Sequence, residues 1–222
     1  MTGLSDQPTR RGALIVVEGL DRAGKSSQCE KLCDHLSNQK QAVKYVRFPD
    51  RTTPIGKLID SYLRGSSQLD DHSIHLLFSA NRWELAKSIQ DDIAHGITVI
   101  VDRYSYSGVV YSAAKANPTL SLEWAWQPEI GLPRPDICLF LSISAQEAAK
   151  RGGFGAERYE NETMQTRVRE LFRTIFERQH DVCIVDAGGS FDQVSQEILG
   201  AVSNCMVRLD AIGPLRTLGP LA

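Results

Sequence analysis

Residues 19–27, GLDRAGKSS, decide which fold this chain is expected to adopt. The stretch starts with a glycine, continues with four variable residues and then has Gly-Lys-Ser, the pattern of a phosphate-binding loop. The apolar run ALIVV (13–17) precedes it, and an amphipathic helical pattern follows it between Cys29 and Leu36. A chance match to the pattern would rarely join a strand to a helix in this way. The sequence therefore predicts that this loop binds a nucleoside triphosphate.

The loop is expected to bind phosphate mainly through its backbone. Its N–H groups and the N-terminus of the following helix would face the anion. Lys25 can reach the β- and γ-phosphates, and the Ser26 hydroxyl can bind Mg²⁺. The loop residues predicted to contact ATP are Gly19, Asp21, Ala23, Gly24, Lys25, Ser26 and Ser27. No Asn-Lys-x-Asp segment for guanine recognition occurs in the sequence, which argues against a GTP switch.

Composition indicates one ordinary globular domain. The chain has 222 residues, of which 42% are hydrophobic and 23% are charged, and its formal net charge is −2. This balance predicts no nucleic-acid partner. The longest strictly apolar run, 13–17, is too short for a membrane span, and the polar N-terminus has no secretory signal. With five cysteines in no framework spacing, we expect reduced thiols and a cytoplasmic location, with the nucleus as an additional compartment.

Short apolar runs alternate with amphipathic stretches along the chain. The runs are ALIVV (13–17), VKYVRF (43–48), ITVIV (97–101), ICLFLSI (137–143) and VCIVDA (182–187). Such alternation predicts an α/β protein with a mostly parallel sheet covered by helices on both faces. Ligands bind these sheets at the carboxyl ends of the strands. The polar residues that follow the runs should therefore meet at one edge.

Two arginines and an aspartate lie at these predicted strand ends. Arg51 follows the second run, where its guanidinium could bind a phosphate in a bidentate manner, although a solvated surface arginine is the alternative. Asp102 and Arg103 follow the third run. The acid could hold the water shell of Mg²⁺ and the arginine could bind phosphate, or the two could form a structural ion pair.

Phe78 and Arg82 are four residues apart in HLLFSANRWE and so share a helix face. The ring could stack on a base while the guanidinium donates to an exocyclic oxygen. A core phenylalanine beside a solvated arginine has the same spacing. From the residues alone, both interpretations remain open.

Five motifs in order resemble the thymidylate kinase (dTMP kinase) family: GLDRAGKSS, FPDRTTPIG, LLFSANRWE, DRYSYSGVVYS and GFGAERYE. The resemblance runs from about Ala13 to Gly189. It implies a P-loop nucleoside-monophosphate kinase fold, with a five-stranded parallel sheet flanked by helices and a short lid. It also implies transfer of the γ-phosphoryl group of ATP to dTMP in the pathway to dTTP.

The resemblance assigns roles within the acceptor site. Arg51 and Arg103 would bind the phosphate of dTMP, Phe78 would stack on thymine, and Arg82 would donate to a thymine carbonyl. Tyr111 would crowd the ribose 2′ position. The dTMP-binding residues expected in this way are Asp21, Phe48, Arg51, Phe78, Arg82, Arg103, Ser107, Gly108, Tyr111, Tyr159 and Glu160.

The resemblance also explains the charged residues inside the phosphate loop. Asp21 would contact the 3′-hydroxyl of dTMP, and Arg22 would be a catalytic arginine supplied in cis, as in the eukaryotic type of the family. The expected catalytic residues are Arg22, Lys25, Asp102 and Arg103. Mg²⁺ would be bound by Ser26 and Asp102, partly through water.

A lid is expected at about 144–163, where KRGGFGAERYE suits a mobile cover. Within it, Arg151 would pack against adenine. Gly188 and Gly189 would lie at the adenine pocket. The single kinase domain would span 1–222, with a core at about 11–205 and loose tails at 1–10 and 206–222. The family also implies a homodimer.

A dianionic phosphate acceptor needs no general base, so Glu18, before the loop, is expected to be structural. Two other functions compete with this prediction. A deoxynucleoside kinase would use Glu18 as a base on a nucleoside hydroxyl, and a catalytically silent regulator would bind nucleotide without turnover. The two histidines His72 and His75 are expected at the surface, without a metal.

Overall fold

The computed structural model describes residues 10–151, 157–177, 179 and 181–221. The expected N-terminal tail 1–9 and the glycine-rich part of the lid, residues 152–156, lie outside the described residues. None of the helices in the described part of the chain is long and apolar enough to cross a membrane.

A five-stranded sheet forms the centre of the molecule, in the order β2-β3-β1-β4-β5. Every pairing between neighbouring strands is parallel. The strands are β1 (Leu14–Gly19), β2 (Val43–Arg47), β3 (Thr98–Asp102), β4 (Ile137–Ser142) and β5 (Val182–Asp186). Each lies within one of the five apolar runs or within two residues of it, so the predicted α/β sheet is confirmed. The three central strands are almost entirely buried because helices cover both faces, which is why they are continuously apolar.

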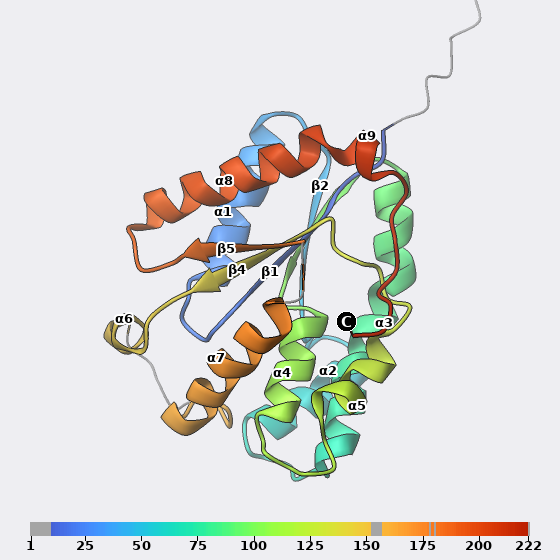
Figure 1. Cartoon of the computed structure of the whole chain (residues 1–222). Helices are drawn as coiled ribbons and strands as arrows, with labels where there is room; N and C mark the ends of the chain where they lie inside the picture. The colour runs from blue at the N-terminus through green and yellow to red at the C-terminus, as the bar shows by residue number, and fades with distance from the viewer. Residues whose placement is uncertain (1–9, 152–156, 178, 180, 222) are drawn as a thin grey trace, which may run out of the picture.

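Helices cover the two faces in separate groups (Figure 1). On one face, α1 packs against α8 and against β1, β2 and β3, while α8 also contacts β4 and β5. On the other face, α3 contacts β3, α4 contacts β1, and α7 packs against α4. The helices are α1 (Lys25–Asn38), α2 (Pro54–Leu63), α3 (Asp71–Ala94), α4 (Ser105–Ala113), α5 (Leu122–Trp126), η1 (Gln127–Glu129), α6 (Ala145–Lys150), α7 (Glu162–Phe176), α8 (Phe191–Val207) and α9 (Leu209–Ile212).

Local sequence explains where the helices near the site begin. Thr53 caps α2 by accepting from the Gly56 N–H, and Pro54 occupies the first turn, where its missing N–H costs nothing. Asp70 caps α3, and Asn161 caps α7 just after the lid. These caps fix the ends of α2, α3 and α7 around one edge of the sheet, which is the edge where β1, β2 and β3 end.

The C-terminal segment 206–221 is ordered against the body of the protein, so the expectation of a loose tail there is wrong. After α9 the chain runs back beside the turn that follows η1, where Thr217 pairs with Pro133. The Leu218 N–H donates to Leu132 O, and Leu218 is 4% exposed. Prolines and glycines prevent a regular element after α9, but backbone hydrogen bonds fix the extended chain there equally well.

Candidate active site

The phosphate loop joins β1 to α1 as expected. Gly24 begins the helix with φ +89°, and a side chain at Gly19 (φ +149°) would lie 2.7 Å from the carbonyl oxygen of Leu141. Both positions therefore need glycine. The Lys25 ammonium is buried under the loop and donates to Leu20 O at 2.6 Å. Burial and the nearby charge of Arg103 lower the pKa of Lys25 to about 8.

Ser26 and Asp102 meet at the carboxyl end of β3. The Ser26 hydroxyl donates to Asp102 Oδ2 at 2.5 Å, and the Tyr45 hydroxyl donates to the same oxygen at 3.1 Å. Among the described residues, no group of three or more His, Cys, Asp or Glu side chains could hold a metal by itself. One hydroxyl and one carboxylate fit Mg²⁺, which proteins bind with few side chains, several waters and substrate phosphates.

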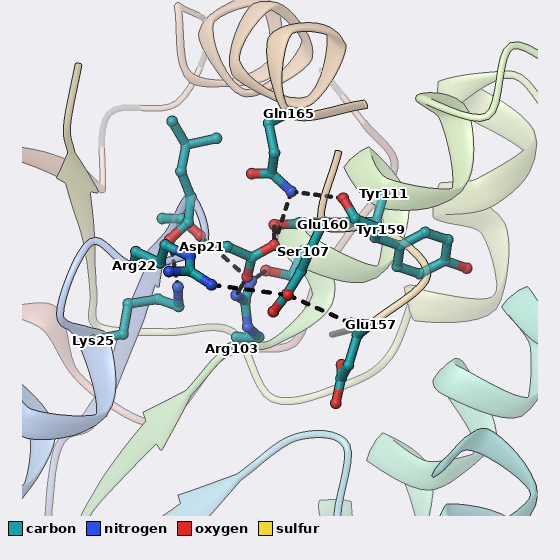
Figure 2. A network of polar contacts seen from close by, with 12 residues as sticks. Asp21, Arg22, Lys25, Arg103, Ser107, Tyr111, Glu157, Tyr159, Glu160 and Gln165 are labelled. Carbon is teal, nitrogen blue, oxygen red and sulfur yellow. Dashed lines mark hydrogen bonds and ion pairs between the residues drawn. The ribbon is translucent and has the colours of Figure 1, made fainter. Parts of the chain in front are cut away.

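Asp21 connects the phosphate loop to the acceptor side (Figure 2). Its carboxylate pairs with Arg103 and accepts from the Tyr111 hydroxyl at 3.0 Å and from Gln165 Nε2 at 2.8 Å. Burial raises the pKa of Asp21, but the charges of Arg103 and Lys25 lower it more, so the net shift is downward. Asp21 is therefore anionic at neutral pH. Gln165 was not predicted, because a lone glutamine in α7 has no distinguishing pattern.

Arg22 is directed from the loop toward the lid. Its backbone has φ +68°, uncommon for a residue with a side chain. Its guanidinium Nη2 lies 3.9 Å from Glu160 Oε2, and the side chain is 13% exposed. Figure 2 shows Arg22 beside Lys25 and facing Glu160. The loop arginine therefore lies between Lys25 and the lid residue Glu160.

A cavity of about 220 Å³ opens beside the loop. All eleven residues that the family resemblance assigned to the dTMP site line it: Asp21, Phe48, Arg51, Phe78, Arg82, Arg103, Ser107, Gly108, Tyr111, Tyr159 and Glu160. They come from the loop after β1, the chain after β2 and β3, α3, α4 and the lid. The lining residues that were not predicted are Arg47, Pro49, Leu63, Tyr104, Ser112 and Glu157.

A buried ion pair fixes Arg82 at one end of this cavity. Its Nε and Nη2 donate to the two carboxylate oxygens of Glu129 at 2.7 and 2.6 Å, and the two side chains are 3% and 0% exposed. A side chain at Gly108 would lie 2.4 Å from Arg82 Nη2, so only glycine allows the guanidinium to approach α4. Arg82 is thus a buried pocket residue, unlike the solvated alternative. Glu129 was missed because it lies 47 residues away, in the short helix η1.

Arg51 forms ion pairs with Asp60 at 2.6 Å and with Glu157 at 2.8 Å. All three side chains are about one-third exposed or less. Arg51 therefore bridges α2 and the lid at the mouth of the cavity. A phosphate that binds this guanidinium would share its five N–H donors with the two carboxylates.

Glu18 is structural in the sense predicted. It is completely buried and accepts from the N–H groups of Tyr104 and Ser107 at 2.9 Å and from the Ser107 hydroxyl. Burial raises the pKa of this carboxyl above its ordinary value. Both oxygens hold the start of α4 onto β1, and this leaves no role for Glu18 as a base toward a substrate.

The donor side of the loop has a smaller pocket of about 100 Å³, lined by Ala23, Gly24, Gln28, Arg151, Ala187, Gly189, Phe191 and Val194. Arg151 donates to Arg22 O at 3.0 Å and to Ala187 O at 2.6 Å. Gly189 lines this pocket, whereas Gly188 does not and instead donates its N–H to Asp186 at 2.9 Å.

His75 corrects the expectation of a surface histidine, because its side chain is completely buried. Its ring nitrogens contact Ser112 Oγ at 2.7 Å and Ala125 O at 2.8 Å. Helical spacing alone could not place it, because α3 is covered by other elements around much of its surface. His72, by contrast, has a side chain that is 30% exposed.

Comparisons with known proteins show which family this chain belongs to. The thymidylate kinase family model matches residues 17–198. The thymidylate kinase of Homo sapiens is 48% identical over 190 residues, which cover 85% of this chain and 89% of the human protein. The Schizosaccharomyces pombe enzyme is 48% identical over 198 residues, 87% of this chain and 93% of that protein. The solved structure of Candida albicans thymidylate kinase superimposes with a TM-score of 0.80 at 43% identity, and the match covers 87% of this chain and 92% of that one. This chain belongs to the thymidylate kinase family.

Proposed function

We propose that this chain transfers the γ-phosphoryl group of ATP to dTMP, giving ADP and dTDP on the route to dTTP. The observation that carries the proposal is the 220 Å³ cavity, which gathers the eleven expected acceptor residues beside the phosphate loop. Asp21 belongs to both regions, since it lies in the loop and also lines the cavity. A nucleotide in the cavity would therefore meet the end of the ATP phosphate chain.

The cavity has one charged region and one region suited to a base. Arg51 and Arg103 would bind the acceptor phosphate, and Asp21 and Tyr111 would contact the sugar. Phe78 would stack on the base, while Arg82, fixed by Glu129, would donate to a carbonyl oxygen. The other expected residues of this site, Phe48, Ser107, Gly108, Tyr159 and Glu160, would complete its walls.

Catalysis would depend on alignment and charge neutralisation. The acceptor is a phosphate monoester whose second pKa is about 6, so it is largely dianionic at neutral pH and needs no general base. Arg22, Lys25 and Arg103 would stabilise the charge that spreads over the transferring phosphoryl oxygens. The 3.9 Å separation between Arg22 and Glu160 allows the lid carboxylate to orient this guanidinium.

Mg²⁺ would be held by Ser26 and by Asp102, in part through water. It would supply neutralisation of negative charge on the ATP phosphates. Asp102 also accepts from Tyr45, and this contact keeps the carboxylate directed toward the loop. The remaining loop residues, Gly19, Ala23, Gly24 and Ser27, would contact the phosphates, while Arg151 and the Gly188–Gly189 turn would border adenine.

We also propose that the chain forms a homodimer through α2 and α3. Leu76 and Trp83 are seven residues apart on α3 and are 47% and 44% exposed, and Leu58 on α2 is 54% exposed. Residues spaced by seven share a helix face, so this exposed apolar surface suits a second copy. Sedimentation analysis should give a dimer for the wild type and a monomer for Leu76→Glu. A wild-type monomer at micromolar concentration would refute the dimer.

The competing deoxynucleoside kinase would need Glu18 as a base, but both of its oxygens accept hydrogen bonds from α4 and its N-terminus. The test is ADP formation from ATP and Mg²⁺ with dTMP, dUMP, UMP, dCMP, AMP and thymidine offered separately. We expect dTMP to be strongly preferred. A preference for thymidine would refute the phosphate-acceptor site, and no turnover despite ATP binding would indicate a regulator.

A further inference from the structure

A short turn of the lid, residues 157–160, has two sides with different partners. Glu157, Tyr159 and Glu160 line the acceptor cavity. Of these four described residues, Arg158 is the one that the cavity lining leaves out, and its side chain runs instead to the end of α2 and the chain after it. The Glu160 N–H donates to Glu157 O at 3.0 Å and closes the turn. Fixing one residue of this turn therefore helps to fix the others.

Arg158 donates to several acceptors at the C-terminal end of α2 and just beyond it. Its Nε donates to Tyr62 O, Nη1 to Gln68 Oε1 and Nη2 to Ser67 O, each at 3.1 Å. The backbone N–H of Arg158 donates to Leu63 O at 3.0 Å. The guanidinium carbon lies 4.2 Å from the centre of the Tyr62 ring, where a cation is attracted by the ring electrons. Arg158 therefore attaches the lid turn to α2 through main-chain, side-chain and ring contacts.

The residues that receive Arg158 belong to the packed body of the protein. Tyr62 and Leu63 end α2, and the last carbonyls of a helix lack partners within it and favour a positive charge. The Tyr62 side chain is buried, and Lys115 Nζ donates to its hydroxyl at 3.1 Å and to Asp71, at the start of α3, at 2.9 Å. The Tyr62 ring is thus fixed between α2, α3 and the turn after α4.

The other side of the lid turn reaches the phosphate loop (Figure 2). Glu160 Oε2 lies 3.9 Å from Arg22 Nη2, and the same oxygen accepts from the Glu157 N–H at 3.4 Å. The position of the Glu160 carboxylate therefore depends on the turn. The direction of the Arg22 guanidinium depends in part on this carboxylate, because opposite charges at this distance attract each other.

We propose that Arg158 is a positioning residue for phosphoryl transfer, because it anchors the lid turn on α2 and so holds Glu160 where it orients Arg22. This role rests on the proposed function, in which Arg22 stabilises charge on the transferring phosphoryl group. Arg158 acts through Glu160 and does not itself contact the transferring group, since its donors face α2 and the chain after it. Loss of the anchor should therefore slow the chemical step and leave ATP binding by the loop unchanged.

The first test removes the anchor and separates kcat from KM. In Arg158→Met, single-turnover phosphoryl transfer should slow about tenfold, because a displacement of about 1 Å can cost about 10²-fold. The KM for ATP should stay within about twofold, as expected when an interaction is lost only in the transition state. Arg173→Met, at an exposed arginine of α7, is the control and should match the wild type.

A second variant separates the anchoring contacts from the charge. Arg158→Lys keeps the charge but has no planar fork for the three acceptors and no guanidinium plane for the Tyr62 ring. Its transfer rate should therefore stay at least about fivefold below that of the wild type. A residue that acted only by its positive charge near the phosphates would be replaced well by lysine.

The third test asks whether Arg158 acts through Glu160. Glu160→Gln removes the charge that faces Arg22 and should itself slow transfer about threefold or more. In this background, Arg158→Met should slow transfer by less than about threefold further, whereas two independent effects would multiply.

Four outcomes would overturn this role while the wild type still prefers dTMP. They are an Arg158→Met rate within about threefold of the wild type, a wild-type rate in Arg158→Lys, a wild-type rate in Glu160→Gln, and effects of Arg158→Met and Glu160→Gln that multiply. If the wild type itself does not use dTMP, the proposed function fails first. If Arg158→Met does not fold, as judged by its melting temperature, the same cycle with Arg158→Lys decides.

Discussion

The donor and acceptor sides of this site are built in different ways. The donor side depends on one contiguous loop, residues 19–27, whose backbone N–H groups are proposed to face the phosphates. The acceptor side depends on side chains from distant parts of the chain, and partners far away in sequence hold several of them in place. Arg82 is fixed by Glu129, Asp21 by Gln165, and Ser112 by His75. A site that binds through backbone N–H groups can be recognised from a short sequence motif. A site whose side chains are held by residues distant in sequence cannot.

The largest effect should come from Arg22, one of the two catalytic side chains that the loop is proposed to supply. Arg22→Ala should lower kcat by about 10³-fold or more, because a positioned arginine stabilises charge mainly in the transition state. The KM for ATP should change little, since Lys25 and the backbone remain. Single-turnover phosphoryl transfer measures this directly.

Arg173→Ala, an exposed arginine near the end of α7, is the control and should turn over like the wild type. Undiminished single-turnover rates in Arg22→Ala would remove Arg22 from the mechanism. The donor side would then act through its backbone and Lys25 alone.

Removing the ion pair between Glu129 and Arg82 should weaken binding of dTMP more than binding of ATP. Glu129→Gln leaves a buried guanidinium without a compensating charge, which should lower the free energy of unfolding by about 3–5 kcal/mol. The KM for dTMP should rise well above that of the wild type while the KM for ATP stays similar. Urea unfolding and steady-state kinetics measure the two effects. Equal increases in both KM values would contradict the separation of the two sides.

The donor side should depend on pH through Lys25, whose pKa is lowered to about 8 by burial and by Arg103. The free protein loses the Lys25 charge above this pH, so kcat/KM for ATP should fall as pH rises, by about tenfold at pH 9. Phosphate favours the charged form, so ATP binding near pH 8.5 should take up a proton. Calorimetry in buffers of different ionisation enthalpy detects it.

The matched variant is Lys25→Arg, which stays charged over this range and should show no proton uptake. If Lys25→Arg takes up a proton on ATP binding as the wild type does, the proton binds to a group other than Lys25. The pH profile with dTMP as the varied substrate should be flatter, because arginines are proposed to bind the acceptor phosphate.

The smallest effect is expected at the mouth of the cavity. Glu157 pairs with Arg51 where dTMP phosphate is proposed to bind, and both side chains are about one-third exposed. Glu157→Gln should therefore tighten dTMP binding by about two- to fivefold, the usual value of such a partly exposed pair. Equilibrium binding without ATP measures it. Weaker binding in Glu157→Gln would mean that Glu157 supports the acceptor site and does not compete for Arg51.

The same contrast determines how much could be predicted from sequence. All five strands, and the edge of the sheet where the polar residues meet, could be predicted from the apolar runs and the P-loop, because these signals are local. The acceptor residues came from five family motifs, and the cavity brings them together. Glu129, Gln165 and the buried His75 could not be predicted, since burial and partner choice depend on tertiary packing. The ordered C-terminal segment was missed because irregular backbone has no periodicity.

Because contacts within the protein hold Arg82 and Asp21 in place, we expect the acceptor side to be assembled already in the free protein. Isothermal titration of dTMP into the protein, without ATP and then with a non-hydrolysable ATP analogue and Mg²⁺, tests it most directly. We predict that dTMP binds the free protein at one site per chain, and that the analogue changes its affinity by less than about threefold. Binding of dTMP only in the presence of the analogue would mean that ATP assembles the acceptor side, which would contradict this expectation.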